Sequence, residues 1–191
     1  MRISARADLK PLLKGCGLIG HQTAALLIYG RLMAPPREAQ SMEMDAAEYL
    51  RGMAFHEAGH AVVAWSLNLR VGDIHVRGIG AGNGGAQIGC ANHLPLIDQL
   101  AALAAGKEAE QVFKSPLPDH AGDGDRVMAI NAVLRIFPGS ASEQIQPHLT
   151  AGHVRAHELL VEHQDRVIRL AECLREARQV GACEFLRLMS A

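Results

Sequence analysis

The chain of 191 residues has few aromatic side chains: one Trp, two Tyr and four Phe. Sheet-rich cores such as β-sandwiches usually depend on aromatic and β-branched residues, so this scarcity argues against them. Apolar residues still make up 49% of the chain and charged residues 20%, which is the composition of a globular protein. Because the core must then be aliphatic and rich in alanine, we predict a mainly α-helical fold with a single core of ordinary size.

The chain also lacks an excess of either charge. It has 19 basic and 20 acidic residues, a formal net charge of −1, and no stripe of lysine and arginine. Binding to nucleic acid usually requires a strongly basic face, so we expect no nucleic-acid partner. The four cysteines (Cys16, Cys90, Cys173 and Cys183) are widely spaced and form no C-x-x-C pair. This pattern favours free thiols in a reducing compartment over a disulfide framework.

Long apolar runs are missing as well. The N-terminal run GLIGHQTAALLIYG (17–30) is interrupted by His21 and Gln22 and is too short to span a bilayer. We therefore expect no firm membrane span and a cytoplasmic location, with peripheral attachment to a membrane as the alternative. The paired prolines of APPREAQS (34–41) indicate a linker. Residues 1–44 are predicted to be an N-terminal extension and linker, and residues 45–191 to be the folded domain.

The remaining pattern predicts the secondary structure of that domain. Asp45 and Glu48 suit the start of a helix that runs to about Leu67, and the glycine-punctuated segment 71–89 indicates a small hairpin. Helical spacing recurs in 96–113 and 125–137, on either side of a loop at 115–125 that is rich in proline and glycine. A long helical pattern covers 153–179, and a short one follows Gly181. We expect four or five helices around a small, glycine-rich β element.

The stretch FHEAGHAVVAW (55–65) carries the strongest chemical signal. His56 and His60 are four residues apart, so on a helix both imidazoles point the same way and can reach one metal ion. Glu57 lies about 100° around the helix from His56 and can face the same cleft. This is the H-E-x-x-H arrangement, in which two histidines bind zinc and the glutamate accepts a proton from the metal-bound water. A metal also supplies the partner that such polar groups need inside an apolar helix.

Two protein ligands do not complete a catalytic zinc site, which usually has three and keeps a fourth position for water. No further histidine follows at the spacing of the metzincins. The candidates for the third ligand lie in or beside the glycine-rich loop at 115–125: Asp119, His120, Asp123 and Asp125. The spacing alone leaves the choice among them open.

Four segments together carry a resemblance to a known family: HEAGHAVVAW, the glycine-punctuated strands, LAALAAGKEAEQVF and GDGDRVMA. They resemble the peptidase domain of the FtsH-type, ATP-dependent zinc metalloproteases, over residues 48–189. The resemblance implies a helical, zincin-like metallopeptidase fold, with His56 and His60 as zinc ligands and Glu57 as the base. In that family the third ligand is an aspartate that begins a D-x-x-x-A helix. Asp125 fits this pattern, and Asp123 is the fallback.

The resemblance implies a zinc metalloendopeptidase that cleaves a protein or peptide substrate through a metal-activated water. His120 is a further candidate, as a donor on the substrate side of the zinc. The family normally also carries a membrane anchor and an ATPase module, and this chain has no clear anchor and no Walker lysine. We therefore expect a stand-alone peptidase, or one that works with an AAA+ unfoldase partner or as a homo-oligomer.

Two other interpretations stay open at this point. In the first, the domain binds zinc without catalysis and acts as an interaction or regulatory module that docks on a full-length FtsH-type protease. In the second, the helices form a metal-free assembly domain. A second metal site at His153 and His157 is not expected, because no cysteine or acidic residue in the sequence completes it convincingly.

Overall fold

The computed structural model describes residues 44–78 and 84–190. The side chains of Asp119 and His120 are outside this description, although their backbone is included. The predicted N-terminal extension and linker lie almost entirely outside the described residues. Among the helices that are described, none is both long enough and apolar enough to cross a membrane.

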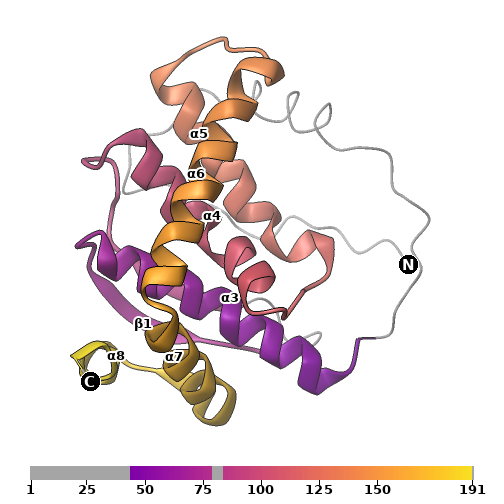
Figure 1. The fold of residues 1–191 in the computed structure, drawn as a ribbon, viewed down its shortest axis with the longest axis vertical. Coiled ribbons are helices and arrows are strands. Elements are labelled where there is room, and N and C mark those ends of the chain that lie inside the picture. The colour runs from indigo at the N-terminus through magenta and orange to yellow at the C-terminus, as the bar shows by residue number, and fades with distance from the viewer. Residues whose placement is uncertain (1–43, 79–83, 191) are drawn as a thin grey trace, which may run out of the picture.

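The described part of the chain contains six α-helices, one 3-10 helix and three short strands (Figure 1). In chain order they are α3 (Ala46–Ser66), β1 (Val71–His75), β2 (Gly85–Ile88), α4 (Leu96–Val112), the 3-10 helix η1 (Asp119–Gly122), α5 (Asp123–Ile136), α6 (Ser142–Glu162), α7 (Gln164–Ala177), β3 (Gln179–Val180) and α8 (Ala182–Ser190). The predicted fold class, mainly α with a small β element, is confirmed.

Helix α3 lies at the centre of the fold. Its first turn is capped by Asp45, whose Oδ1 accepts a hydrogen bond from the backbone N–H of Ala47 at 2.9 Å. Nearly every residue from Leu50 to Ala64 is buried, because α4 and α7 pack along the helix and α6 and the sheet cover more of it. A helix that is apolar on all sides belongs in such an interior position.

Close contact between α3 and α4 depends on Gly59. A Cβ added there would lie 2.6 Å from the Cβ of Ala109 and 2.7 Å from the backbone oxygen of Ala105. The two helices therefore approach more closely than a larger side chain on α3 would permit. This close approach brings the histidines of α3 against α4.

The three strands form an antiparallel sheet in the order β2-β1-β3. The β1–β2 pair is the hairpin expected for 71–89, with Ile74 opposite Ala86. The third strand was not predicted. It is two residues long, too short to show an alternating pattern, and it exists because Val180 pairs with Ile74 on the other side of β1.

The predicted division of the C-terminal half was wrong in two respects. The predicted helices leave 138–152 outside any helix, but α6 begins at Ser142 and accommodates Pro147 in its second turn. The pattern at 153–179 was read as one helix, but the chain turns at His163, where α6 ends and α7 begins. The turn lets α7 pack against α3, and the rings of His163 and Trp65 meet there at 5.6 Å. This turn explains why there are six described helices rather than four or five.

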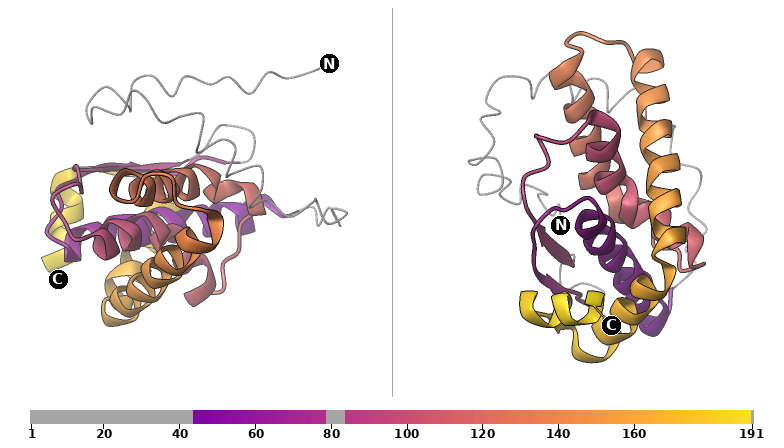
Figure 2. Two further views of the ribbon diagram at one scale, coloured as in Figure 1. Left: turned by 90° about the horizontal axis from the view of Figure 1, so that it is seen from above. Right: turned by 60° about the vertical axis from the view of Figure 1, so that its left-hand side comes forward.

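The buried apolar residues form two clusters. The larger one surrounds α3 and includes residues of the sheet, α7 and α8, and the smaller one lies between α4, α5 and α6. Helix α4 belongs to both, since Ala105 and Ala109 face the first cluster and Leu100 the second. Figure 2 shows α8 near one end of the molecule and the α5–α6 connection at the other.

Candidate metal centre

Three side chains from two helices converge where α3 faces the first turn of α5. His56 and His60 come from α3, and Asp125 comes from α5. The two Nε2 atoms are 3.2 Å apart, and Oδ2 of Asp125 lies 3.2 Å from Nε2 of His60 and 3.4 Å from Nε2 of His56. Within the described ranges, this is the group of histidine and carboxylate ligands whose atoms lie close enough together to hold a metal ion.

The other ring nitrogen of each histidine is held by an acceptor. Nδ1 of His56 lies 2.9 Å from Oε1 of Glu110, and Nδ1 of His60 lies 2.8 Å from the backbone oxygen of Ala102. A carbonyl oxygen and an ionised carboxylate can only accept, so each Nδ1 carries the hydrogen and donates it. The two Nε2 atoms of neutral rings therefore present lone pairs to each other and to Asp125. Such an arrangement requires a cation at its centre, either a proton or a metal ion.

The spacing of these atoms fits a tetrahedral ion. Bonds of about 2.0–2.1 Å to zinc place neighbouring ligand atoms about 3.3–3.4 Å apart. The three observed separations, from 3.2 to 3.4 Å, match this value. Two imidazole nitrogens and one carboxylate oxygen are also a donor set that suits zinc, and three protein ligands leave one position for water. The residues present therefore fit a catalytic zinc ion.

The pKa shifts of these three side chains also indicate that positive charge is stabilised where they meet. Burial lowers the pKa of His56, but hydrogen bonds to Asp125 and Glu110 outweigh it and raise that pKa from 6.5 to about 9. The pKa of His60 is also raised, because the charge of Asp125 outweighs burial. The pKa of Asp125 is strongly lowered, since the two histidine rings outweigh the effect of burial. Without metal, a proton occupies the place that a divalent ion would take.

Glu57 follows the first histidine and is 6% exposed. Burial raises the pKa of its carboxyl above the ordinary value of 4.5, although the positive charges of His60 and His56 oppose this. The carboxylate lies toward the start of β2, where a Cβ added to Gly84 would be 2.8 Å from its Oε1. A carboxylate made more basic by burial, beside a metal position, suits a general base.

Sequence reasoning assigned no role to Gly106 of α4. A Cβ at this position would lie 2.4 Å from Nε2 of His60 and 2.5 Å from Nε2 of His56. Residue 106 must therefore lack a side chain for the imidazoles to occupy their places against α4. A glycine inside an otherwise alanine-rich helical pattern is the signal that could have indicated this close approach.

Sequence reasoning also missed Glu110, which is 2% exposed. Its Oε2 accepts hydrogen bonds from Nζ of Lys107 at 2.9 Å and from the backbone N–H of Leu117 at 3.0 Å. Burial raises the pKa of Glu110, but its hydrogen bonds, led by that from His56, outweigh this and lower the pKa overall. Glu110 therefore stays ionised and orients the ring of His56. In the sequence it looks like an ordinary helix-surface glutamate.

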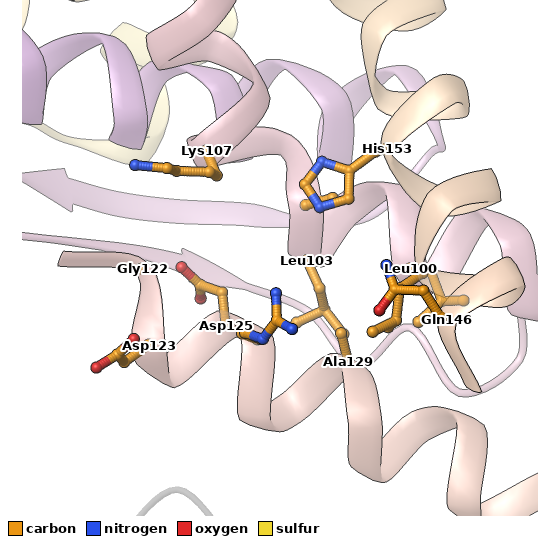
Figure 3. A pocket seen from close by; sticks show the side chains of 12 residues that line it. Leu100, Leu103, Lys107, Gly122, Asp123, Asp125, Ala129, Gln146 and His153 are labelled. Carbon is orange, nitrogen blue, oxygen red and sulfur yellow. The ribbon is translucent and has the colours of Figure 1, made fainter. Parts of the chain in front are cut away.

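The structure does not bring every predicted candidate to the site. Asp123, the fallback ligand, lines a neighbouring pocket and is not part of the ligand group. Figure 3 shows its carboxylate directed away from Leu103 and Ala129. The proposed role of His120 as a substrate-side donor lies outside the described residues, because its side chain is not described.

The second histidine pair has an acidic partner that the sequence did not reveal. His153 and His157 of α6 lie with Nδ1 at 3.2 Å and 3.0 Å from the two carboxylate oxygens of Glu108 on α4. Each imidazole uses one oxygen, so the three residues form a hydrogen-bonded link between the two helices. They are not among the groups with metal-ligand spacing in the described part of the chain.

Comparison with known proteins gives a distant likeness. No protein-family model matches the chain. The mitochondrial inner membrane m-AAA protease component AFG3L1 of Mus musculus is 27% identical to it over 164 residues. This alignment covers 73% of the present chain and 20% of the mouse protein, so the chain spans about a fifth of the length of its relative. The chain that carries this histidine–histidine–aspartate group is thus distantly similar to part of a protease component.

Proposed function

We propose that the chain is a zinc metallopeptidase that hydrolyses peptide bonds in protein or peptide substrates. The observation that carries the proposal is the meeting of two imidazole Nε2 atoms and the Asp125 carboxylate at separations of 3.2–3.4 Å. Both imidazoles are oriented by partners on α4 that keep their lone pairs toward the ion. The distant likeness to a protease component agrees with this activity.

In the proposed reaction, zinc bound at the site supplies one effect: it lowers the pKa of a water to about 7. His56, His60 and Asp125 hold the ion, and Glu110 keeps the ring of His56 in the required orientation. Glu57 accepts the proton of the attacking water and returns it to the amine that leaves. Burial of Glu57 makes its carboxylate more basic, which favours the first of these transfers.

The experiment is turnover of casein by the zinc-loaded chain. Casein is largely unfolded, so its cleavage needs no ATP-driven unfoldase. We expect Glu57→Gln to lower the rate by about 10²–10⁴, the usual contribution of a general base. The variant should still bind about one zinc per chain, because the proposed ligands are unchanged. Glu143→Gln, on the exposed face of α6, is the matched control and should cleave at the wild-type rate.

The outcomes separate the interpretations that the sequence left open. Equal cleavage by wild type and Glu57→Gln would refute the catalytic assignment. Zinc binding without cleavage by either protein would favour the catalytically silent interaction module. Absence of bound zinc would favour the metal-free assembly domain. An AAA+ unfoldase partner or a homo-oligomer belongs to the same proposal, and would be needed only for the degradation of folded substrates.

A further inference from the structure

A pocket of about 160 Å³ opens next to the candidate metal centre, between α4, α5 and α6 (Figure 3). Asp125 and Gly122 form part of its wall, so the pocket shares a residue with the ligand group. A cavity that holds a single water molecule needs a volume of about 10–15 Å³. The pocket is therefore large enough for a side chain or the terminal residue of a peptide. A group bound in the pocket would therefore lie beside the candidate metal centre.

The pocket is apolar on one side and polar on the other. Its apolar wall consists of Leu100, Leu103, Ala104, Ala129 and Leu149. Across from α5, Lys107 of α4 and His153 of α6 form part of the polar wall (Figure 3). A ligand that suits both sides has an aliphatic stem and a polar end.

Most of the charged residues that line the pocket already have a partner or face the metal position. Nζ of Lys107 pairs with Glu110, Nδ1 of His153 pairs with Glu108, and Asp125 faces the metal position. Asp123 lies at the rim, with its carboxylate directed outward (Figure 3). The remaining charge is the guanidinium of Arg126, which forms no ion pair with a described residue.

Arg126 also has an unsatisfied donor. Its Nε is buried and has no hydrogen-bond partner among the described residues. A buried N–H without an acceptor is destabilising, and native proteins rarely leave one unless a ligand or water completes it. A carboxylate is the group that matches a guanidinium best, because two oxygens can accept from two nitrogens in parallel.

We propose that the pocket lined by Arg126 is a substrate subsite that binds a peptide carboxylate, with the aliphatic stem against Leu103 and Ala129. The proposal rests on the proposed peptidase function. Two sources share this chemistry: an acidic side chain close to the scissile bond and the free C-terminus of a peptide. In both cases Arg126 fixes which bond of the substrate is presented to Glu57.

Peptide binding tests the subsite without relying on cleavage. The protein is the full, zinc-loaded chain with Glu57→Gln, so that peptides are bound but not hydrolysed. The probes are four fluorescein-labelled heptapeptides of alanine and leucine, with glutamate or glutamine at the centre and a free or an amidated C-terminus. Fluorescence anisotropy gives the dissociation constants. The peptides are compared in two ways: glutamate against glutamine, and free against amidated C-terminus. In one of these comparisons we expect the peptide with the carboxylate to bind about 10- to 100-fold more tightly, as for a charged hydrogen bond.

Substitution of the arginine identifies the origin of that preference. Arg126→Gln should remove it, and Arg126→Lys should keep part of it because the charge remains. Arg175→Gln removes an exposed arginine on α7, away from the pocket, and should leave the preference unchanged. If Arg126→Gln does not fold, Arg126→Met serves as the second variant, because it keeps the stem of the side chain without the charge.

The results discriminate between the two proposals. A preference for glutamate identifies the side chain as the source, and a preference for the free C-terminus identifies the chain end; both support the subsite. Equal binding of all four peptides, or a preference that survives Arg126→Gln, would overturn it. Arg126-dependent binding without casein turnover would leave the subsite standing and remove the peptidase. Turnover of casein without any carboxylate preference in peptide binding would support the peptidase and overturn the subsite.

Discussion

At the scale of single residues, His56 illustrates how a ligand depends on a neighbour that is not a ligand. Its Nε2 faces His60 and Asp125, while its Nδ1 donates to Glu110. Glu110 in turn is held by the side chain of Lys107 and the backbone of Leu117. A change at Glu110 therefore acts on the metal through the orientation and basicity of one imidazole.

We expect Glu110→Gln to weaken zinc binding about 10- to 100-fold, the usual effect of removing a carboxylate that orients a ligating histidine. The amide oxygen can still accept from His56, but it carries no charge to make the ring more basic. Competition with a fluorescent zinc chelator measures the affinity. Glu143→Gln, which touches no ligand, should bind zinc like the wild type, and an unchanged affinity for Glu110→Gln would show that this contact is unimportant.

Zinc binding should also depend on pH. The pKa of His56 in the metal-free protein is raised from 6.5 to about 9, so at pH 7 the ring holds a proton that zinc must displace. Calorimetry in buffers of different ionisation enthalpy should show release of about one proton or more at pH 7. The apparent affinity for zinc should rise with pH up to about 9. Affinity that stays constant between pH 7 and 9 would contradict this.

The same shift has a consequence for the metal-free protein. A histidine whose pKa is higher in the folded protein than in the unfolded protein stabilises the folded state. This contribution is complete below the pKa of the unfolded protein and disappears as the pH rises through the pKa of the folded protein. The metal-free chain should therefore lose stability between about pH 6.5 and pH 9. The zinc-loaded chain should not show this particular loss, because the ion takes the place of the proton.

At the scale of elements, the packing of α3 on α4 positions the site. Gly59→Ala should lower the free energy of unfolding by about 1–3 kcal/mol, because the added methyl group would overlap Ala109 and the backbone of Ala105. Urea unfolding monitored by circular dichroism gives the value. Gly124→Ala, at a helical position where no atom of the described residues lies within 4 Å of the added Cβ, is the matched control and should be at least as stable as the wild type. Equal stability of both variants would show that the two helices can separate without cost.

The elements that the sequence predicted well are those with local signals. Helix α3 has an N-cap at Asp45 and a continuous apolar pattern, and the β1–β2 hairpin has its glycines. The elements that were missed depend on distant partners. Strand β3 forms because it pairs with the edge of β1. The turn at His163 is stabilised by the packing of α7 against α3. Neither cause is visible within a window of neighbouring residues.

The same distinction applies to the candidate site. The spacing of His56 and His60 follows from the helical period, so it could be read directly. Asp125 is 65 residues beyond His60. Spacing alone did not select it from its acidic neighbours, and only the family resemblance favoured it. Glu110 had no local signal, and the glycine at 106 indicated only a close approach, because both roles arise from the contact of two helices.

At the scale of the whole molecule, the candidate metal centre joins the two apolar clusters. The two histidines lie on α3, at the centre of the larger cluster, and Asp125 lies on α5, whose buried residues belong to the smaller one. The ion would therefore add a cross-link between two clusters that α4 and α6 already join. Its removal should affect the stability of the entire domain.

Chelation provides the measurement. Zinc at a hundredfold excess over its dissociation constant contributes about 2.7 kcal/mol to stability. For a chain of this size, that corresponds to a rise in Tm of about 5–10 °C. In scanning calorimetry, EDTA should lower the Tm by the same amount. Added zinc should restore the original Tm, and added magnesium should not. The same Tm with and without EDTA would mean that the folded chain does not bind the ion.

The ligands come from α3 and α5, which are separated in the chain by two strands, α4 and the loop at 113–118, and this has a further consequence for the proposed function. A copy in which α5 has not yet closed onto α3 lacks the Asp125 ligand and cannot hold the ion in a working geometry. Hydrolytic capacity would then appear only when folding is complete.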